Sequence, residues 1–356
     1  MTTTLTAPEP CVALLKDLEE DTAAQYDDIF LRADFGDTGS VPATGLLSTS
    51  PDIIPSGIAP IADPVKVFTD NYANTGANGK DLVANAQNYV YMRGKNLHNG
   101  PESGTLQLYY SPASLLLYPN LWSQNQLKTS AGKATVPVSA KNLGDIVVGQ
   151  DPFTWVPQIP SSGDHYCLIG RVVTPSHPNP IPPIGNISDF ASYIAHNRGM
   201  GWRNVVVVDK GSPTFTNSIG YNQGEMGGNM YVAIKGISVP KGAEVTFSCG
   251  DSGPSPLINM TTPPFTATGA DFLVGLPTRI PANFASNISY SYTACGTTPP
   301  PGWSVSIVVF FFAPPGHDAY ARGISPHKLG IRGAALEEIG PMMAVAVGSQ
   351  TMVLPS

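Results

Sequence analysis

The most reactive side chains in this sequence form one cysteine–histidine pair. His165 and Cys167 stand two positions apart in a segment of β-strand character, so their side chains would share one face of the strand. A neighbouring imidazole can activate a cysteine as a thiolate nucleophile. Such a pair also needs a third group that orients the base, and a cysteine inside a strand is more often a core residue. The pair therefore favours packing over catalysis.

Metal-ligating residues are present without the spacing that metal sites require. The six histidines form no H-E-x-x-H pattern. His317, Asp318 and His327 could bind a metal together, although chance placement on the surface explains them more simply. The segment 34–39 (DFGDTG) offers oxygen ligands but falls short of the calcium pattern D-x-[DN]-x-[DN]-G. We expect neither a metal nor another cofactor, and calcium binding by this loop stays open.

Other catalytic signatures are also missing from the sequence. There is no G-x-S-x-G elbow, no P-loop and no G-x-G-x-x-G after a strand. The glycine-rich segment 220–228 lacks a lysine for phosphate and is interpreted as a flexible loop. One sequence does not reveal whether two carboxylates face each other across a glycosidic bond. The tryptophans could stack on sugars, although core packing is the simpler interpretation; they are Trp122, Trp155, Trp202 and Trp303. We therefore predict no catalytic residues and no enzymatic activity.

The overall charge argues against nucleic acid as a partner. Charged residues make up 13% of the chain and the net charge is −7, with no cluster of lysines and arginines. Binding to nucleic acid depends on such a basic patch. A weakly charged surface gives little repulsion between molecules and suits assemblies or extracellular modules, but it equally suits a plain sandwich rich in small residues.

The composition predicts an all-β protein with two domains. The 36 glycines and 35 prolines are about one residue in five, whereas roughly 12% is usual. So many turn residues are typical of short strands joined by tight turns. With 356 residues, the chain exceeds what one hydrophobic core usually supports. We predict two tandem β-sandwich domains, at residues 25–210 and 211–315, with terminal arms at 1–24 and 316–356.

Apolar and polar residues alternate in several segments of the first half, most clearly at 89–93 and 105–110. The predicted strands are 28–32, 52–54, 89–95, 105–111, 144–148, 154–157, 165–173 and 202–209. A long loop at 174–198, rich in proline at its start, contains a predicted short helix at 187–196.

Six segments of this half, in this order, resemble an immunoglobulin-like module found in many bacterial proteins of extracellular type. They are residues 50–53 (SPDI), 88–93 (NYVYMR, followed by Asn96), 106–111, 153–157, 165–171 and 197–205. The chain departs from the pattern at 94–97, where an Arg-Asn-Arg-Gly-like turn is usual. The resemblance covers about residues 25–210. It implies an immunoglobulin-like fold with a non-catalytic accessory role, and it carries no catalytic residues.

The second half matches no family that we recognise and has the pattern of a second sandwich, so we expect two immunoglobulin-like β-sandwich domains in tandem. Its predicted strands are 230–237, 243–249, 271–276, 286–293 and 303–313. Cys249 and Cys295 lie in two of these runs, and a bridge between them could join two sheets. Free thiols are the alternative, which we favour because the sequence shows no Sec signal.

The terminal segments have the character of arms. Apolar residues between 12 and 18 recur at near-helical spacing, which predicts a short amphipathic helix that covers its own domain or docks on a partner. The C-terminal segment has a possible helical turn at 334–339 and apolar runs at 342–347 and 352–354. It would either fold back on its own domain or add a strand to a neighbouring subunit.

The expected location follows from the absence of two signals. The longest apolar run, 304–314, has strand length and is too short to span a bilayer. The N-terminus lacks the basic and apolar regions of a signal peptide, so we expect synthesis in the cytoplasm and release or export by a non-Sec route.

These patterns together favour a non-enzymatic structural or assembly protein. It would self-associate or dock into a larger particle through its terminal arms, as a homo-oligomer or as part of a larger protein assembly. The alternative is a secreted effector or toxin-like binding module that recognises a cell-surface glycan or protein.

Overall fold

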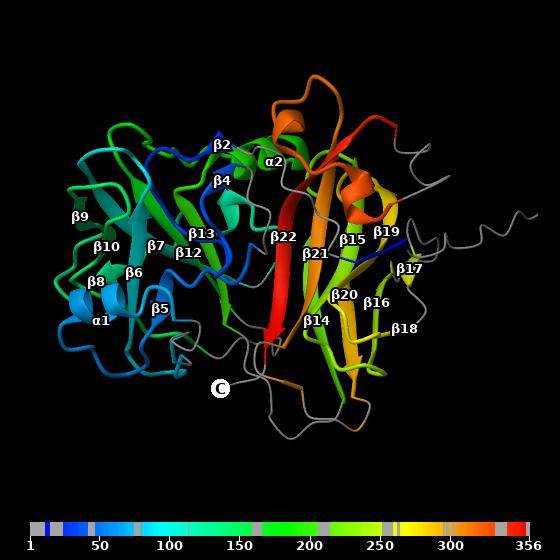
Figure 1. Cartoon of the computed structure of the whole chain (residues 1–356), viewed down its shortest axis with the longest axis horizontal. Coiled ribbons are helices and arrows are strands. Elements are labelled where there is room, and N and C mark those ends of the chain that lie inside the picture. Colours follow the sequence, from blue (N-terminus) through cyan, green and yellow to red (C-terminus); the bar gives the residue numbers. More distant parts are fainter. Residues whose placement is uncertain are drawn as a thin grey trace, which may run out of the picture.

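The computed structural model describes most of the chain. The described residues are 11–14, 24–41, 47–74, 79–80, 82–112, 114–158, 166–205, 214–250, 259–261, 264–294, 296, 299–300, 303–331 and 340–353. The fold is all-β, as predicted, with antiparallel sheets and two short α-helices (Figure 1). No helix in these residues combines the length and the hydrophobicity that crossing a bilayer would take.

Two facing sheets from the first half form what we name the first sandwich. In one sheet, the central strand β6 pairs with four short strands, and one of these pairs with β8. The bounds are β3 (Ile29–Phe30), β5 (Ile53–Pro55), β6 (Asn88–Asn96), β8 (Lys128–Thr129), β10 (Ile146–Val148) and β11 (Phe153–Trp155). The facing sheet has the order β13 (Met200–Val205), β12 (Tyr166–Val173), β7 (Glu102–Pro112) and β9 (Val136–Ala140). A small ribbon joins β2 (Ala24–Gln25) to β4 (Ser40–Val41).

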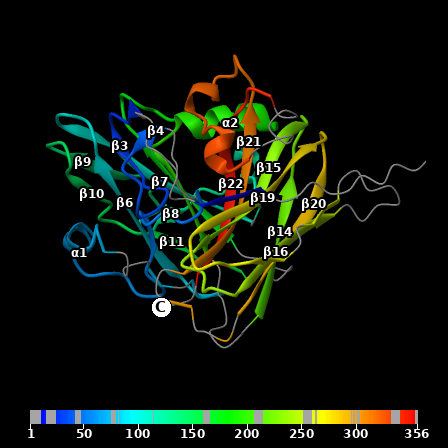
Figure 2. The same cartoon turned by 45° about the vertical axis from the view of Figure 1, so that its right-hand side comes forward.

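The second half forms the second sandwich, seen on the right of Figure 1 and turned in Figure 2. Its first sheet has the order β1 (Cys11–Leu14), β19 (Phe272–Ile280), β15 (Gly228–Ile237), β21 (Ser304–Ala313) and β22 (Met343–Val353). The facing sheet has the order β14 (Thr214–Asn222), β20 (Ala285–Thr293), β16 (Glu244–Gly250) and β17 (Asn259–Thr261), and β18 (Phe265–Thr266) also pairs with β16.

The uninterrupted apolar run of β21 follows from burial on both faces. Ile307 and Phe311 point into the core between the two sheets, whereas Val308 and Phe312 point to the opposite face. That outer face is covered by the following segment, which contains two short 3-10 helices at Tyr320–Arg322 and Pro326–Leu329. A strand covered on both sides loses the usual alternation of apolar and polar residues.

Helix α2 (Ile187–His196) occupies the residues that the sequence predicts. Asn186 begins it, because its side chain accepts a hydrogen bond from the Asp189 N–H and so satisfies one free donor of the first turn. Phe190 and Ile194 lie on its buried face. The other helix, α1 (Pro64–Asp70), was not predicted; Asp63 caps it and Phe68 is its buried residue.

The terminal segments differ from simple arms. The helix predicted between 12 and 18 is wrong for its first residues, because Cys11–Leu14 forms β1 and pairs with β19 of the second sandwich, and its remaining residues lie outside the described ones. The C-terminal segment folds back on its own sheet, since β22 pairs with β21 from Met343 to Val353 with one irregularity near Gly348. The predicted helical turn at 334–339 lies outside the described residues.

The predicted flexible loop at 220–228 is also corrected. Its first residues end β14, its last residue begins β15, and only the short stretch between them is a connection. Glycines at both ends of this stretch hid the strands, because glycine weakens any strand pattern in a sequence.

Candidate functional site

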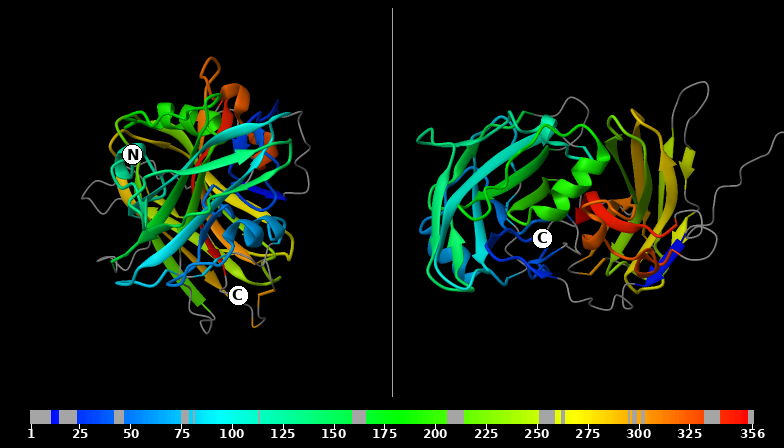
Figure 3. Two further views of the ribbon diagram at one scale, coloured as in Figure 1. Left: turned by 90° about the vertical axis from the view of Figure 1, so that its left-hand side faces the viewer. Right: turned by 90° about the horizontal axis from the view of Figure 1, so that it is seen from above.

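The two sandwiches meet along a continuous apolar contact that we name the seam. The outer face of the sheet containing β12 and β13 lies there against α2 and β22 (Figures 1 and 3). One cluster of buried side chains runs through the seam into the core of the second sandwich. Its members at the seam include Cys167, Ile169, Phe190, Ile194, Trp202, Val345 and Val347. The seam is therefore packed like the inside of a domain.

A row of hydroxyl groups crosses the seam beside these apolar residues. Ser48 Oγ lies 2.8 Å from Ser349 Oγ and 3.3 Å from Thr351 Oγ1, and Thr351 Oγ1 lies 2.9 Å from Ser306 Oγ. Asn204 Nδ2 donates to the Ser349 carbonyl at 3.4 Å. All four hydroxyl-bearing residues are buried, so this row fixes the two sandwiches in one register.

Cys167 lies next to the same row, in contact with Asn204. Its side chain is 1% exposed, and Sγ lies 2.9 Å from Asn204 Oδ1. The imidazole that the sequence places beside it, His165, lies outside the described residues. The thiol is thus enclosed by packing, which agrees with the interpretation of a core cysteine.

A small hollow opens at one end of the seam. It is lined by Arg198, Arg322 and mostly apolar side chains, among them Ile194, Trp202 and Val345. Arg198 is 3% exposed and its Nη2 forms an ion pair with Asp37. One of the two cations in the hollow is therefore already neutralised by the chain itself.

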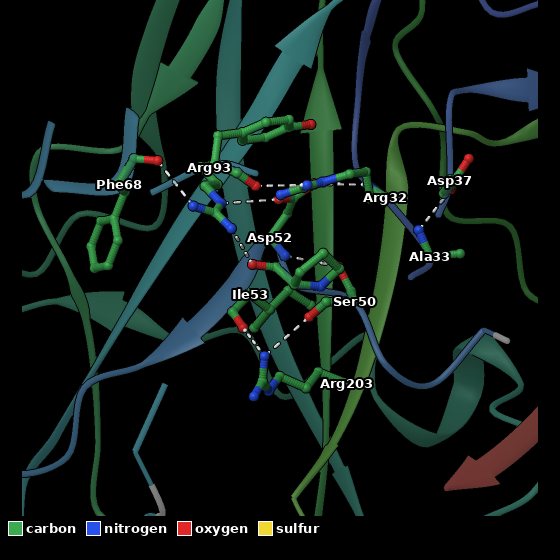
Figure 4. Close-up of polar contacts among 11 residues, drawn as sticks. Arg32, Ala33, Asp37, Ser50, Asp52, Ile53, Phe68, Arg93 and Arg203 are labelled. Carbon is green, nitrogen blue, oxygen red and sulfur yellow. Dashed lines mark hydrogen bonds and ion pairs between the residues drawn. The ribbon is translucent and has the colours of Figure 1, made fainter. Parts of the chain in front are cut away.

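The second polar centre is an ionic cluster inside the first sandwich (Figure 4). Asp52, with a fully buried carboxylate, accepts from Arg32 Nη2 at 2.5 Å and from Arg93 Nε at 3.1 Å. Arg93 also donates to the Phe68 carbonyl at 2.9 Å. The Tyr72 ring lies under the Arg32 guanidinium, with its centroid 3.5 Å from Cζ. The cluster thereby ties β5 and β6 to the segment that contains α1.

The shared carboxylate shifts the pKa values of the two arginines to different extents. Burial lowers the pKa of Arg32, but the paired hydrogen bonds and the charge of Asp52 outweigh burial and raise that pKa overall. Burial also lowers the pKa of Arg93, and its single contact with Asp52 does not compensate, since Arg32 repels it. Both guanidinium groups remain charged at neutral pH. The cluster therefore holds two cations around one anion and has no free acid or base.

Several segments that carry the immunoglobulin-like resemblance meet around this cluster. Asp52 and Arg93 come from the first two of them. Arg203, from the last, donates from Nη1 to the carbonyls of Ser50 and Ile53 at 3.2 and 3.1 Å. Asn96 donates from Nδ2 to the Gly100 carbonyl at 2.9 Å and so holds the hairpin between β6 and β7. These contacts are structural clamps between loops and strands.

Sequence patterns alone do not single out the arginines and the aspartate as one group. The sequence does contain one sign of the cluster, which is a charged residue inside a strand pattern, as with Arg93 at the end of Tyr91-Met92-Arg93. A charge that becomes buried in a strand needs a partner. The partner itself is 41 positions away, and only the fold brings it near.

Among the metal candidates, His317 and Asp37 are engaged in other contacts, whereas Asp318 and His327 are exposed. His317 Nε2 lies 2.7 Å from Ser188 Oγ, and its Nδ1 accepts from the Ala319 N–H at 3.1 Å. Both ring nitrogens are thus used. Asp37 accepts from two backbone amides and pairs with Arg198, which leaves the segment 34–39 without its strongest carboxylate. Within the described residues, no three acidic, histidine or cysteine side chains gather in the manner of a metal site.

The remaining candidates are core residues. The four tryptophans are at most 9% exposed, so none offers a surface for a sugar ring. Cys249 is a buried free thiol, and burial raises its pKa to about 11. Cys295 lies outside the described residues.

The sequence matches no family model. No curated protein matches it either. Solved structures that align with it include a collagen adhesin from S. aureus, with 10% identity and a TM-score of 0.17 over 64% of this chain and 82% of the adhesin. The vicilin from Solanum melongena aligns with 8% identity and a TM-score of 0.11 over 76% and 88% of the two chains. Likeness this low carries no conclusion about family or function.

Proposed function

We propose that this chain is a non-enzymatic structural protein whose two sandwiches act as one rigid block in a larger assembly. The continuous apolar core through the seam is the observation that carries the proposal. Two modules that only need to bind separate ligands are commonly joined by small, polar contacts. A core-like seam with a buried row of hydroxyl groups fits a rigid block in which the two sandwiches keep a fixed relative orientation.

The polar centres support the same proposal. Asp52 and Asp37 are paired with arginines, and Cys167 is enclosed. We also propose that the first sandwich belongs to the immunoglobulin-like class, on the basis of the six segments that carry the resemblance. In this view the chain ends, not a cleft, make contact with other molecules.

Size-exclusion chromatography with light scattering on the full chain tests the proposal. A discrete oligomer, or incorporation into a particle, is the expected result. A monomer at every concentration that binds cells or glycan arrays would overturn it in favour of a recognition module. Hydrolysis of ester, peptide or glycan substrates that is lost in Cys167→Ala would overturn the non-enzymatic part.

A further inference from the structure

The strand β1 is an unusual member of its sheet. The other four strands of that sheet come from the continuous region 228–353, whereas β1 comes from the other end of the chain. The next strand after it, β2, belongs to the first sandwich. The chain therefore docks four residues on the far sandwich before it begins to build the near one (Figures 1 and 3).

The pairing of β1 is short and confined to one part of β19. Register pairs run from Cys11 with Gly275 to Leu14 with Phe272, so five of the nine residues of β19 extend beyond β1. Pro10 precedes the strand and has no N–H to donate to a ladder. On β19, Pro277 and the exposed Arg279 discourage pairing beyond Gly275. The edge thus accepts a short strand at 272–275.

The connection between β1 and β2 has the length to reach a neighbouring molecule. Nine residues separate Leu14 from Ala24, and the ten steps between these residues span at most about 33 Å. Within one molecule the connection joins opposite sides of this sheet, because β1 forms one edge and β22, next to the first sandwich, forms the other. Four strand spacings correspond to about 19 Å. A second copy whose β19 edge lies within the same reach can accept the strand equally well.

We propose that β1 is exchanged between copies of this chain, so that the strand of one copy pairs with residues 272–275 of the next. Exchange preserves every contact that β1 makes within one molecule, and swapping an identical element is a low-cost route to oligomers. An unprotected sheet edge is in any case a template for a strand from another chain. The inference rests on the proposed assembly function and names both the partner, a second copy, and the connecting element.

The direction of exchange decides the kind of assembly. If two copies trade strands reciprocally, a closed dimer results. If each copy passes its strand onward, a ring or an open filament results. In each case the seam is unaffected, because β22 and not β1 forms the edge of the sheet at the seam.

A disulfide trap across the β1–β19 pair tests exchange directly. Ala13 and Leu273 are Cα partners, so the variant Ala13→Cys/Leu273→Cys, in a Cys11→Ser background, places two thiols opposite each other. After oxidation with glutathione disulfide, exchange predicts covalent species larger than the monomer on a denaturing, non-reducing gel: a dimer if two copies trade strands reciprocally, and a ladder of oligomers if each copy passes its strand onward. Mixing the two single-cysteine variants should give covalent dimers in which each chain contributes one cysteine.

The controls separate the possible failures. Ala13→Cys/Ser103→Cys, with the second cysteine on the first sandwich, should give no ladder. Light scattering of the reduced trap variant must match the unaltered chain, which shows that the substitutions leave assembly intact. A monomeric band on the gel from an oligomer in solution would overturn exchange but leave the assembly proposal standing. An unaltered chain that stays monomeric in solution would overturn both.

Discussion

At the scale of single residues, we expect the buried charges of the first sandwich to contribute more to the free energy of unfolding than an exposed ion pair does. Asp52 compensates two arginines, and all three side chains are almost completely buried. Removing one partner of such a group leaves an uncompensated charge in a medium of low polarity.

The variant Asp52→Asn should therefore lower the free energy of unfolding by about 3–5 kcal/mol, measured by urea denaturation. The matched control is Asp70→Asn, which breaks the exposed pair between Lys66 and Asp70 and should leave the urea midpoint unchanged. Equal midpoints for both variants would contradict the structural role of the cluster.

Tyr72 contributes its ring and not its hydroxyl group. The hydroxyl is buried and has no hydrogen-bond partner within the described residues, whereas the ring stacks on Arg32. Tyr72→Phe should retain full stability, and Tyr72→Leu should lose about 1–2 kcal/mol because the cation–π contact disappears. A loss in the phenylalanine variant would show that the hydroxyl makes a stabilising contact after all.

Lys235 gives the protein a dependence on pH. Burial lowers its pKa, and the charges of Asp34 and Asp271 only partly offset this. Because the folded-state pKa lies below the unfolded value near 10.4, the wild type gains stability as the pH rises toward 10. The stability of Lys235→Met does not depend on this ionisation. The variant should therefore exceed the wild type in stability most at pH 7, and the difference should shrink toward pH 10. Thermal midpoints across this range measure the trend, and the exposed Lys133→Met should leave it unchanged.

At the scale of elements, β22 depends on one glycine. A Cβ at Gly348 would lie 2.0 Å from the carbonyl oxygen of Leu115, which belongs to the loop after β7. Gly348 also stands at the irregularity where the register of β22 on β21 shifts. The backbone of the first sandwich therefore approaches this strand too closely for any side chain.

Gly348→Ala should destabilise the protein by about 2 kcal/mol or more, since backbone at the seam would have to move. Thermal unfolding followed by circular dichroism measures the loss. Gly36→Ala is a suitable control, because there a Cβ would meet only a flexible aspartate side chain at 3.3 Å. A neutral result for Gly348→Ala would mean that the seam is looser than the packing indicates.

The elements also show how far the sequence could lead. The strands with clear alternation, such as β6 and β7, and the helix α2 were predicted near their true bounds, because local pattern and capping residues determine them. The strand β1 was predicted as a helix, since four residues at an edge carry no periodicity of their own. Whether the last strand would fold back was left open, because a sheet edge of the same chain and one of a neighbour offer identical ladders.

The ionic cluster and the seam could not be predicted from the sequence for a different reason. Arg93 and Asp52 are far apart in the chain, and Ser48 is about 300 positions from Ser349. No local rule pairs such residues. Each looks like an ordinary polar side chain until both sandwiches are folded.

At the scale of the whole molecule, the joined core predicts one cooperative unit. Scanning calorimetry of the full chain should show one unfolding transition, with equal calorimetric and van't Hoff enthalpies. The isolated fragment 24–205 should aggregate, because it would expose Ile169 and Trp202 to water. Two separate transitions would contradict the seam as a shared core.

The position of β22 in the chain has a consequence for biosynthesis. The ribosome makes this strand after every other described strand, yet the first sandwich needs it to cover its outer face. At about 5–20 residues per second, the stretch from Val205 to Val353 takes roughly 7 to 30 s to appear. During that interval the first sandwich would expose the apolar outer face of its sheet to the cytosol. We therefore expect nascent chains of this protein to bind a chaperone that covers this apolar surface until the last strand has been made.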